Sequence, residues 1–471
     1  MNRNKILIKN TLLYFAGTFS SSLLSFLLLP VYTRYLLPED YGKIDIIFAI
    51  AFIATPIITL QIERACYRFL LESNDENSQK TIISNSFFVL FIGCIVFLII
   101  AFVYITVFPI EYGFIITMYI VFGCLSSFIQ TLLRGVRKNF FYSIIGVAAT
   151  SVSLIANIIF IIGMGLKSVS LLLAPICASI VIIILGIKKV KLFKLLDIDL
   201  LEKKIIKKFL IYSTPLVPDA ICWWILLGFG RVYLNYQSGS EAVGILAIAS
   251  KFPSLLTSFH SIFNLAWRET AFTEYDAEDR DLYYSYVYNK QLILILCGML
   301  ILLPLTRLTI KFLLAESFQS SYVYIPILFL SAAFSMISAF FSSGFEGAKK
   351  TNGIVTSTLY ALIINLVLNI LLVPYFSIYG VAFANAGAYL ALLIARQKKS
   401  KKYFTITVDT KKITPIIIFI MIFGGLYYSH QMVIQVILLF VSIAVFIYYN
   451  QTAISFVLLK LQRMTNKTNK I

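Results

Sequence analysis

The sequence predicts an all-α, polytopic membrane protein with about fourteen transmembrane helices. Three observations lead to this fold class. Hydrophobic residues make up 59% of the 471 and charged residues only 13%, with a mean hydropathy of +0.88, whereas a soluble domain carries far more charge. Apolar runs long enough to cross a bilayer recur along the chain. Lys and Arg gather in the short loops between these runs. Because lipid offers backbone groups no water, such runs are expected to be helical.

Each apolar run is one expected span, and the runs are separated by polar segments. The outer loops are short, and the longer inner loops hold most of the charge. Several spans contain Pro, Gly or Ser, which membrane helices tolerate. In chain order the spans are expected near residues 10–32, 42–62, 83–105, 113–133, 142–163, 169–187, 209–234, 243–267, 289–311, 323–345, 354–374, 379–396, 413–428 and 433–458.

The distribution of Lys and Arg orients these helices. With the N-terminus in the cytoplasm, the inner segments hold 33 of the 40 basic residues. Such a bias favours a cytoplasmic position for both termini. The runs KKVKLFK at 188–194 and KKSKK at 398–402 contribute most. The net charge of +18 is therefore explained by topology and by contact with membrane lipids, and no nucleic-acid partner is expected.

Motifs of enzymes and of metal or nucleotide sites are missing from the sequence. The six cysteines are scattered, so neither a disulfide framework nor a zinc site is indicated. No HExxH motif and no P-loop occurs. Of the two histidines, His260 is expected to be a hydrogen-bonded helix residue rather than a ligand. We therefore expect no catalytic residue, no metal and no other cofactor.

An internal repeat relates the two halves of the chain with an offset of 212 residues. The stretch LRGVRKN at 133–139 aligns with FEGAKKT at 345–351. Without a gap, SLIANIIFII aligns with NLVLNILLVP, so that Asn157 meets Asn369. At a slightly different offset Arg34 pairs with Arg231. The repeat predicts two six-helix lobes followed by two further helices.

The predicted domains are an N-lobe at 1–196, a C-lobe at 197–408, and residues 409–471 with the last two helices and a cytoplasmic tail. Six is an even number, so both lobes enter the membrane in the same direction. A pseudo-two-fold axis along the membrane normal should relate them. Parallel repeats of this kind are typical of transporters whose substrate site lies between the halves.

Basic residues inside the predicted spans are the candidate substrate site, because a charge within the bilayer normally faces a cavity or a partner. Arg34 and Arg231 lie at the outer ends of the first helices of the two lobes, although their stems could instead snorkel to the interface. Lys251 lies about 12 Å into its span at helical rise, too deep for easy snorkelling. Arg64 and Arg68, at the inner end of the second span, are either interfacial or line an inner vestibule.

Three carboxylates and two indoles complete the candidate set. Asp219 follows the sequence PLVP, which should break its helix, and it could either titrate or cap the second half-helix. Asp45 in the second span has the same two possible roles. Glu63 is a sequence neighbour that could compensate the charge of Arg64 and Arg68. Trp223 and Trp224 could stack on sugar faces or serve only in packing. A cavity with an excess of positive charge suits an anion, since Arg binds phosphate oxygens bidentately and Lys as a point charge.

Several stretches, in order and spacing, resemble the Wzx-type polysaccharide-unit flippases of the multidrug/oligosaccharidyl-lipid/polysaccharide exporter superfamily. The resemblance covers nearly the whole chain. It is carried by LLPVYTRYLLPEDYG at 28–42, ACYRF at 65–69, PLVPDAICWW at 215–224 with the following RVYL, GILAIASKF at 244–252, and NILLVPYFSIYG at 369–380.

This resemblance implies a flippase of the bacterial plasma (inner) membrane. It would move an undecaprenyl-diphosphate-linked oligosaccharide from the inner to the outer leaflet by alternating access, for O-antigen, capsule or a similar polysaccharide. A polysaccharide polymerase and assembly proteins are the implied partners. Arg34, Arg68, Arg231 and Lys251 stand where the family has recurrent basic residues. Family members often carry an Asp-Arg pair in span seven, whereas here Gly230 precedes the arginine.

Other functions stay open at this point. A cation-coupled drug exporter of the same superfamily would need a cavity suited to organic cations, and a lipid II flippase would have the same number of spans. A membrane glycan polymerase or ligase would carry a large outer catalytic loop, which the sequence lacks. A membrane scaffold would not need buried basic residues.

Overall fold

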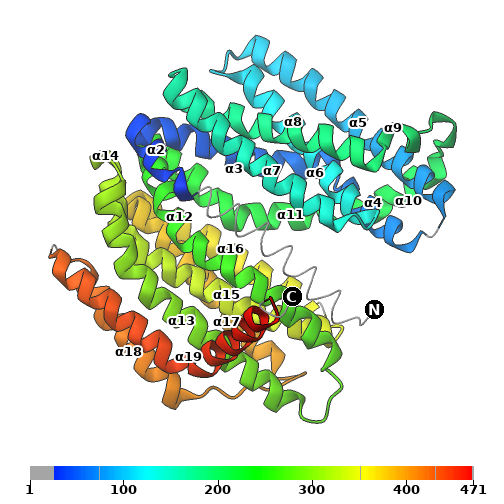
Figure 1. The fold of residues 1–471 in the computed structure, drawn as a ribbon. Coiled ribbons are helices and arrows are strands. Elements are labelled where there is room, and N and C mark those ends of the chain that lie inside the picture. The colour runs from blue at the N-terminus through cyan, green and yellow to red at the C-terminus, as the bar shows by residue number, and fades with distance from the viewer. Residues whose placement is uncertain (1–25, 74, 351, 430, 469–471) are drawn as a thin grey trace. The chain divides into compact units, whose positions relative to one another are not determined.

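The computed structural model describes residues 26–73, 75–350, 352–429 and 431–468. Over these residues the chain forms helices and no β-strand (Figure 1), which confirms the all-α class. Twelve helical segments are long and apolar enough to cross a membrane. They coincide with the thirteen predicted spans from the second to the fourteenth. The numbers differ by one because the 70-residue segment Lys203–Phe272 contains both the seventh and the eighth span. The first predicted span lies mostly outside the described residues, and the count of fourteen stays a prediction.

Packing divides the chain into two compact units. The first unit runs to Ala247 and includes Asn365–Val381. Its helices are α2 (Leu29–Tyr35), α3 (Pro38–Thr59), α4 (Ile62–Glu72), α5 (Glu76–Val107), α6 (Gly113–Gly135), α7 (Asn139–Ile158), α8 (Ser170–Val190), α9 (Leu192–Leu195), α10 (Lys203–Ser213), α11 (Leu216–Trp224) and the first part of α12 (Gly230–Thr273). Two π-helical turns, η1 (Ile159–Gly163) and η4 (Ile225–Phe229), follow α7 and α11.

The second unit comprises Ile248–Ile364 and the chain from Ala382 onward. Its helices are the rest of α12, α13 (Arg280–Leu313), α14 (Glu316–Gln319), α15 (Ile325–Gly347), α16 (Asn352–Phe376), α17 (Ile378–Ser400), α18 (Thr410–Tyr427) and α19 (Met432–Thr468), of which α16 and α17 also contribute to the first unit. The predicted lobe boundaries near 196 and 408, and the two-fold relation of the lobes, stay predictions.

The acidic turn after Arg34 is the start of α3. Pro38 occupies the first helical turn, where its missing N–H costs nothing. Glu39 and Asp40 follow in the same turn, where carboxylates interact favourably with the helix dipole. The helix ends at Thr59, because Leu60 and Gln61 adopt the left-handed conformation with φ of 50° and 55°. The chain then turns into α4.

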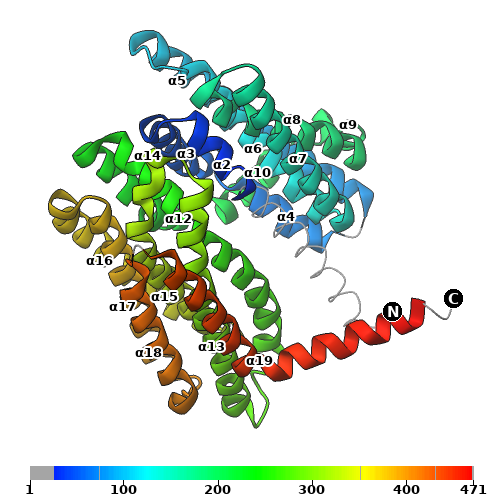
Figure 2. The same cartoon turned by 60° about the vertical axis from the view of Figure 1, so that its left-hand side comes forward.

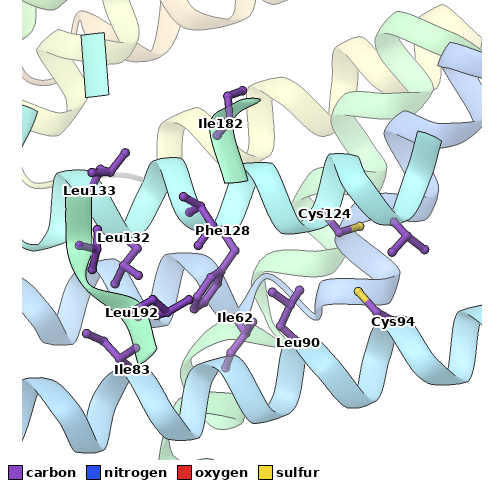
Figure 3. Packing of buried hydrophobic residues seen from close by; sticks show 14 of the residues in the cluster. Ile62, Ile83, Leu90, Cys94, Cys124, Phe128, Leu132, Leu133, Ile182 and Leu192 are labelled. Atoms are coloured by element: carbon purple, nitrogen blue, oxygen red, sulfur yellow. The ribbon is translucent and has the colours of Figure 1, made fainter. Parts of the chain in front are cut away.

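Aliphatic and aromatic side chains from α3 to α10 form the core of the first unit. Ile62, Ile83, Leu90 and Phe128 are at most 2% exposed and pack together with Leu132 between α4, α5 and α6 (Figure 3). Because lipid tails are as apolar as these side chains, close packing rather than removal from water holds membrane helices together. This core fixes α3 and α4, which carry several of the candidate residues.

The last two helices pack on α13 within the second unit. Figures 1 and 2 show α18 and α19 alongside α13. Cys297 and Leu300 of α13, Ile416 and Phe423 of α18, and Leu438 of α19 form one buried cluster. The helices that the sequence appends to the two repeats therefore belong to the second unit.

The internal repeat is visible in local structure. Helix α15 begins and ends 212 residues after α6. Each helix is followed by a basic residue in the left-handed conformation, Arg137 with φ of 58° and Lys349 with φ of 56°. In each turn the next N–H donates to the carbonyl five positions back, at 2.8 Å and 2.9 Å. The two turns are thus the same structure built twice.

The paired asparagines of the repeat also match. Asn157 and Asn369 each donate from Nδ2 to the carbonyl four residues earlier, at 2.8 Å in both cases. Both side chains are buried, and neither Oδ1 has a hydrogen-bond partner among the described residues. Both halves therefore use this residue in the same way.

Candidate functional site

Helices α3 and α12 approach each other closely in the first unit, and two glycines permit it. A Cβ on Gly42 would lie 1.8 Å from the carbonyl oxygen of Ser240, and one on Gly244 would lie 1.9 Å from that of Pro38. No side chain fits at either position without moving backbone. The two glycines that the sequence pairs across the repeat thus face each other's helices. This contact brings the start of α12 to α3.

Arg231 and Asp45 form an ion pair across this contact. Nη1 of Arg231 donates to Oδ2 of Asp45 at 2.7 Å and to Oδ1 at 2.9 Å. The side chains are 30% and 12% exposed, respectively. The arginine is the second residue of α12, and only Gly230 separates it from the π-helical turn η4. Turns of this kind are frequent at functional sites.

Gly230, where family members often carry aspartate, is closely packed. A Cβ at this position would lie 2.8 Å from Oδ1 of Asn369 and 3.0 Å from Val381, so these side chains would have to shift to admit a larger residue. The carboxylate beside Arg231 comes from α3 instead. Sequence reasoning named both residues but did not join them, since they lie 186 positions apart.

Donor capacity is left over on Arg231. Only Nη1 is used by Asp45, and Nε and Nη2 have no hydrogen-bond partner among the described residues. A guanidinium presents five N–H groups, and those on Nε and Nη2 suit two oxygens of one phosphate. The carboxylate holds the arginine in place while two of its nitrogens stay available to an anion.

The two tryptophans at the end of α11 differ in their surroundings. Nε1 of Trp224 donates to the carbonyl of Ala49 at 2.6 Å, and this hydrogen bond links α11 to α3. Trp223 is 36% exposed and could contact a ligand. The break predicted at the prolines occurs at Thr214 and Pro215, between α10 and α11. Asp219 lies in the first turn of α11, is exposed and caps no backbone group.

Among the described residues, no ion pair or hydrogen bond joins the basic residues of α2 and α4 to this pair. Arg34 is in the last turn of α2 and is exposed. Arg68 pairs with Glu72 one turn away, at 2.9 Å, rather than with Glu63. Arg64 is exposed and has no ion-pair partner in the described chain. Burial raises the pKa of the Glu63 carboxyl, which forms no ion pair among the described residues.

Lys251 and His260 lie in the part of α12 that belongs to the second unit. The lysine side chain is half-buried. Nε2 of Gln291 lies 2.7 Å from Nε2 of His260 and donates to the carbonyl of Met336 at 3.1 Å. Because an amide nitrogen only donates, the histidine nitrogen is the acceptor and the ring carries its proton on Nδ1. His260 is thus the hydrogen-bonded helix histidine that the sequence predicts.

A buried arginine of α17 was not among the predicted site residues. Arg396 is 3% exposed and donates to the carbonyl of Ser338 at 3.1 Å and to the hydroxyls of Ser357 and Thr358 at 3.3 Å. It ties α15, α16 and α17 together. In the sequence it is the last residue of a predicted span, where a basic residue indicates topology, so no signal set it apart.

The chain shares its fold with solved membrane transporters. It aligns with the lipid II flippase MurJ in an inward closed conformation, with a TM-score of 0.72 and 15% identity over 95% of this chain and 100% of that chain. A multidrug resistance MATE family transporter of the MOP superfamily, in its inward-facing conformation, gives 0.64 and 13% identity, over 81% and 95%. A MOP superfamily transporter from Pyrococcus furiosus, described as having a binding pocket of reverse polarity, gives 0.55 and 13%, over 84% and 96%. Identities this low establish the fold alone.

Sequence comparison gives the family. The search of curated proteins found no match. A family model described as polysaccharide biosynthesis protein matches residues 7–267, more than half of the chain. The resemblance expected from the sequence motifs is confirmed. The protein therefore belongs to the polysaccharide biosynthesis protein family of Wzx-like flippases, with the fold of the MOP superfamily.

Proposed function

We propose that the protein moves an undecaprenyl-diphosphate-linked oligosaccharide from the inner to the outer leaflet of a bacterial plasma membrane, by alternating access. Family membership and the transporter fold support a membrane flippase. The observation that carries the choice of an anionic substrate is the Arg231–Asp45 pair. A membrane helix here holds a guanidinium that is anchored at one nitrogen and open at the others.

The chemistry of the diphosphate fits this arrangement. In the resting protein Asp45 neutralises Arg231, which limits the cost of a charge inside the membrane. An arriving phosphate would bind Nε and Nη2, while Asp45 keeps the planar group oriented. Arg34, Lys251, Arg64 and Arg68 are proposed as further cations along the path, and Trp223 as a surface for a sugar ring. The prenyl chain would stay in lipid.

The membrane potential contributes to the direction of transport. A diphosphate diester carries about two negative charges, and each charge moved across the full field is worth about 2.3 kcal/mol per 100 mV. Since the cytoplasm is negative, outward movement of the anion is favoured. This term acts without a coupling ion, although Asp45, Asp219 and Glu63 are the carboxylates available for one.

Lipid II is the second candidate substrate. The fold match with a lipid II flippase motivates it, and lipid II offers the same diphosphate. A drug exporter is disfavoured because cations outnumber carboxylates among the candidate residues. A polymerase or ligase is disfavoured because family and fold neighbours are transporters.

Depletion in the native host separates these candidates. Cells lacking the protein should accumulate lipid-linked oligosaccharide that is inaccessible to a membrane-impermeant glycosidase, while lipid II on the outer face stays normal. Re-expression should restore surface polysaccharide. Accumulation of inner-leaflet lipid II instead would assign the second substrate, and normal levels of both lipids would reject the proposal.

A further inference from the structure

An apolar groove with two lysines at one end runs along one face of α10 and continues onto α11 in the first unit. It has a volume of about 730 Å³. Lys203 and Lys207 stand at one end, and the remaining wall is almost entirely apolar. Ile206, Leu210, Ile211 and Pro218 are among the residues that form it. Ile206 and Leu210 are four residues apart and lie on one face of α10, and Pro218 lies on α11.

The opposite face of α10 is fastened to the first unit. Phe209 is 2% exposed and stacks on Phe69 of α4, with 4.9 Å between ring centroids. Nζ of Lys208 lies 4.7 Å from the centroid of the same Phe69 ring. Two lysines of α10 therefore differ by face, because Lys208 is engaged in packing and Lys207 belongs to the groove. The face of α10 opposite the groove therefore packs on α4.

Among the described residues, no carboxylate forms an ion pair with either groove lysine. Within the described chain, neither Lys203 nor Lys207 makes an ion pair or hydrogen bond, and no acidic residue lines the groove. They lie one helical turn apart, so their side chains are neighbours. Together they carry two positive charges. A diphosphate diester carries two negative charges, whereas the phosphodiester of a common anionic phospholipid such as phosphatidylglycerol carries one.

The apolar part of the groove begins next to the lysines. Ile206, Leu210 and Ile211 belong to α10, and Pro218 belongs to α11, beyond the break at Thr214 and Pro215. The lysines sit at the end of a basic inner loop, where headgroups lie under the predicted topology.

We infer that this groove holds the prenyl-diphosphate end of the lipid substrate in the inner leaflet, with the phosphates at Lys203 and Lys207 and the prenyl chain along Leu210 and Pro218. The inference rests on the proposed function, which it deepens by naming a loading site. The Arg231 site would then receive the diphosphate from a position already on the protein.

Photolabelling in membranes tests the inference. The probe is a polyprenyl diphosphate with a diazirine in an isoprene unit near the phosphates, added to vesicles that contain the full-length protein. We expect labelled peptides from α10 and α11. In the variant with Lys203→Gln and Lys207→Gln, labelling should fall about 30-fold, given the strength with which each Lys holds an anionic lipid. Lys203→Arg with Lys207→Arg should retain most of it.

A matched control and competitors complete the test. Lys398→Gln with Lys401→Gln removes the same charge from another basic loop and should leave labelling unchanged. Unlabelled prenyl diphosphate should compete, and phosphatidylglycerol or inorganic diphosphate should not. Equal competition by phosphatidylglycerol would show an ordinary phospholipid site and overturn the inference, as would labelling elsewhere. Transport is measured separately: loss of labelling with normal transport overturns the groove alone, and labelling without transport overturns the proposed function alone.

Discussion

Disruption of the Arg231–Asp45 pair should reveal strong energetic coupling between α12 and α3. Arg231→Gln leaves a carboxylate that is only 12% exposed without its ion-pair partner. Asp45→Asn leaves a guanidinium that is 30% exposed and can turn toward water. Exposed pairs contribute about 0–1 kcal/mol, and loss of one partner of a buried pair costs about 3–5 kcal/mol. For this intermediate burial we expect a coupling free energy of about 2 kcal/mol, with Arg231→Gln the more costly change.

A double-mutant cycle measures this coupling. The free energy of unfolding in mixed micelles, from SDS titration, is compared for wild type, both single variants and the double variant. The exposed pair of Lys43 and Glu39 on α3, at 2.8 Å and 48% and 59% exposed, is the matched control and should give a coupling below about 0.5 kcal/mol. If the Arg231–Asp45 coupling is as small as that of the control, the reasoning about this site is refuted.

Three further predictions follow from the packing and the polar contacts. Gly42→Ala should lower stability by about 1–3 kcal/mol because the methyl group meets backbone, while Gly146→Ala, where no atom lies within 4 Å, should be neutral or stabilising in the same unfolding assay. Gln291→Leu should cost about 1–3 kcal/mol by leaving the buried His260 nitrogen without its donor, and an unchanged unfolding midpoint would contradict this contact. Burial raises the pKa of Glu63, so its ionised form opposes folding above the ordinary pKa of glutamate. Glu63→Gln should therefore raise the melting temperature at neutral pH and leave it unchanged well below that pKa, and the opposite pH trend would refute the assignment.

Sequence reasoning reached the fold because membrane helices are set by local composition. Runs of apolar residues predicted the helices, and a shared offset of 212 predicted the matching turns at Arg137 and Lys349. The predicted end of the second span, near residue 62, differs from the end of α3 at Thr59. Leu60 and Gln61 adopt left-handed conformations there, and neither residue type is typical of such a turn.

The site was only partly predictable, because ion pairs between distant helices depend on tertiary contact. Arg231 and Asp45 were both identified by their cost inside a membrane, but their pairing follows from the close approach at Gly42, which periodicity does not encode. The hydrogen bond from Trp224 to Ala49 is hidden for the same reason. Arg396 was missed because a buried arginine at a helix end has the same sequence signature as a topogenic one.

The most direct test of the central claim compares an anionic and a neutral lipid in purified vesicles. Two fluorescent lipids with the same oligosaccharide and prenyl chain are used, one linked through a diphosphate and one through a glycosidic bond without phosphate. Their movement between leaflets is followed by quenching with a membrane-impermeant reductant. We predict rapid movement of the diphosphate lipid and none of the neutral lipid above protein-free vesicles. Equal movement of both lipids would show that recognition does not depend on the phosphates and would contradict the proposed role of the arginine site.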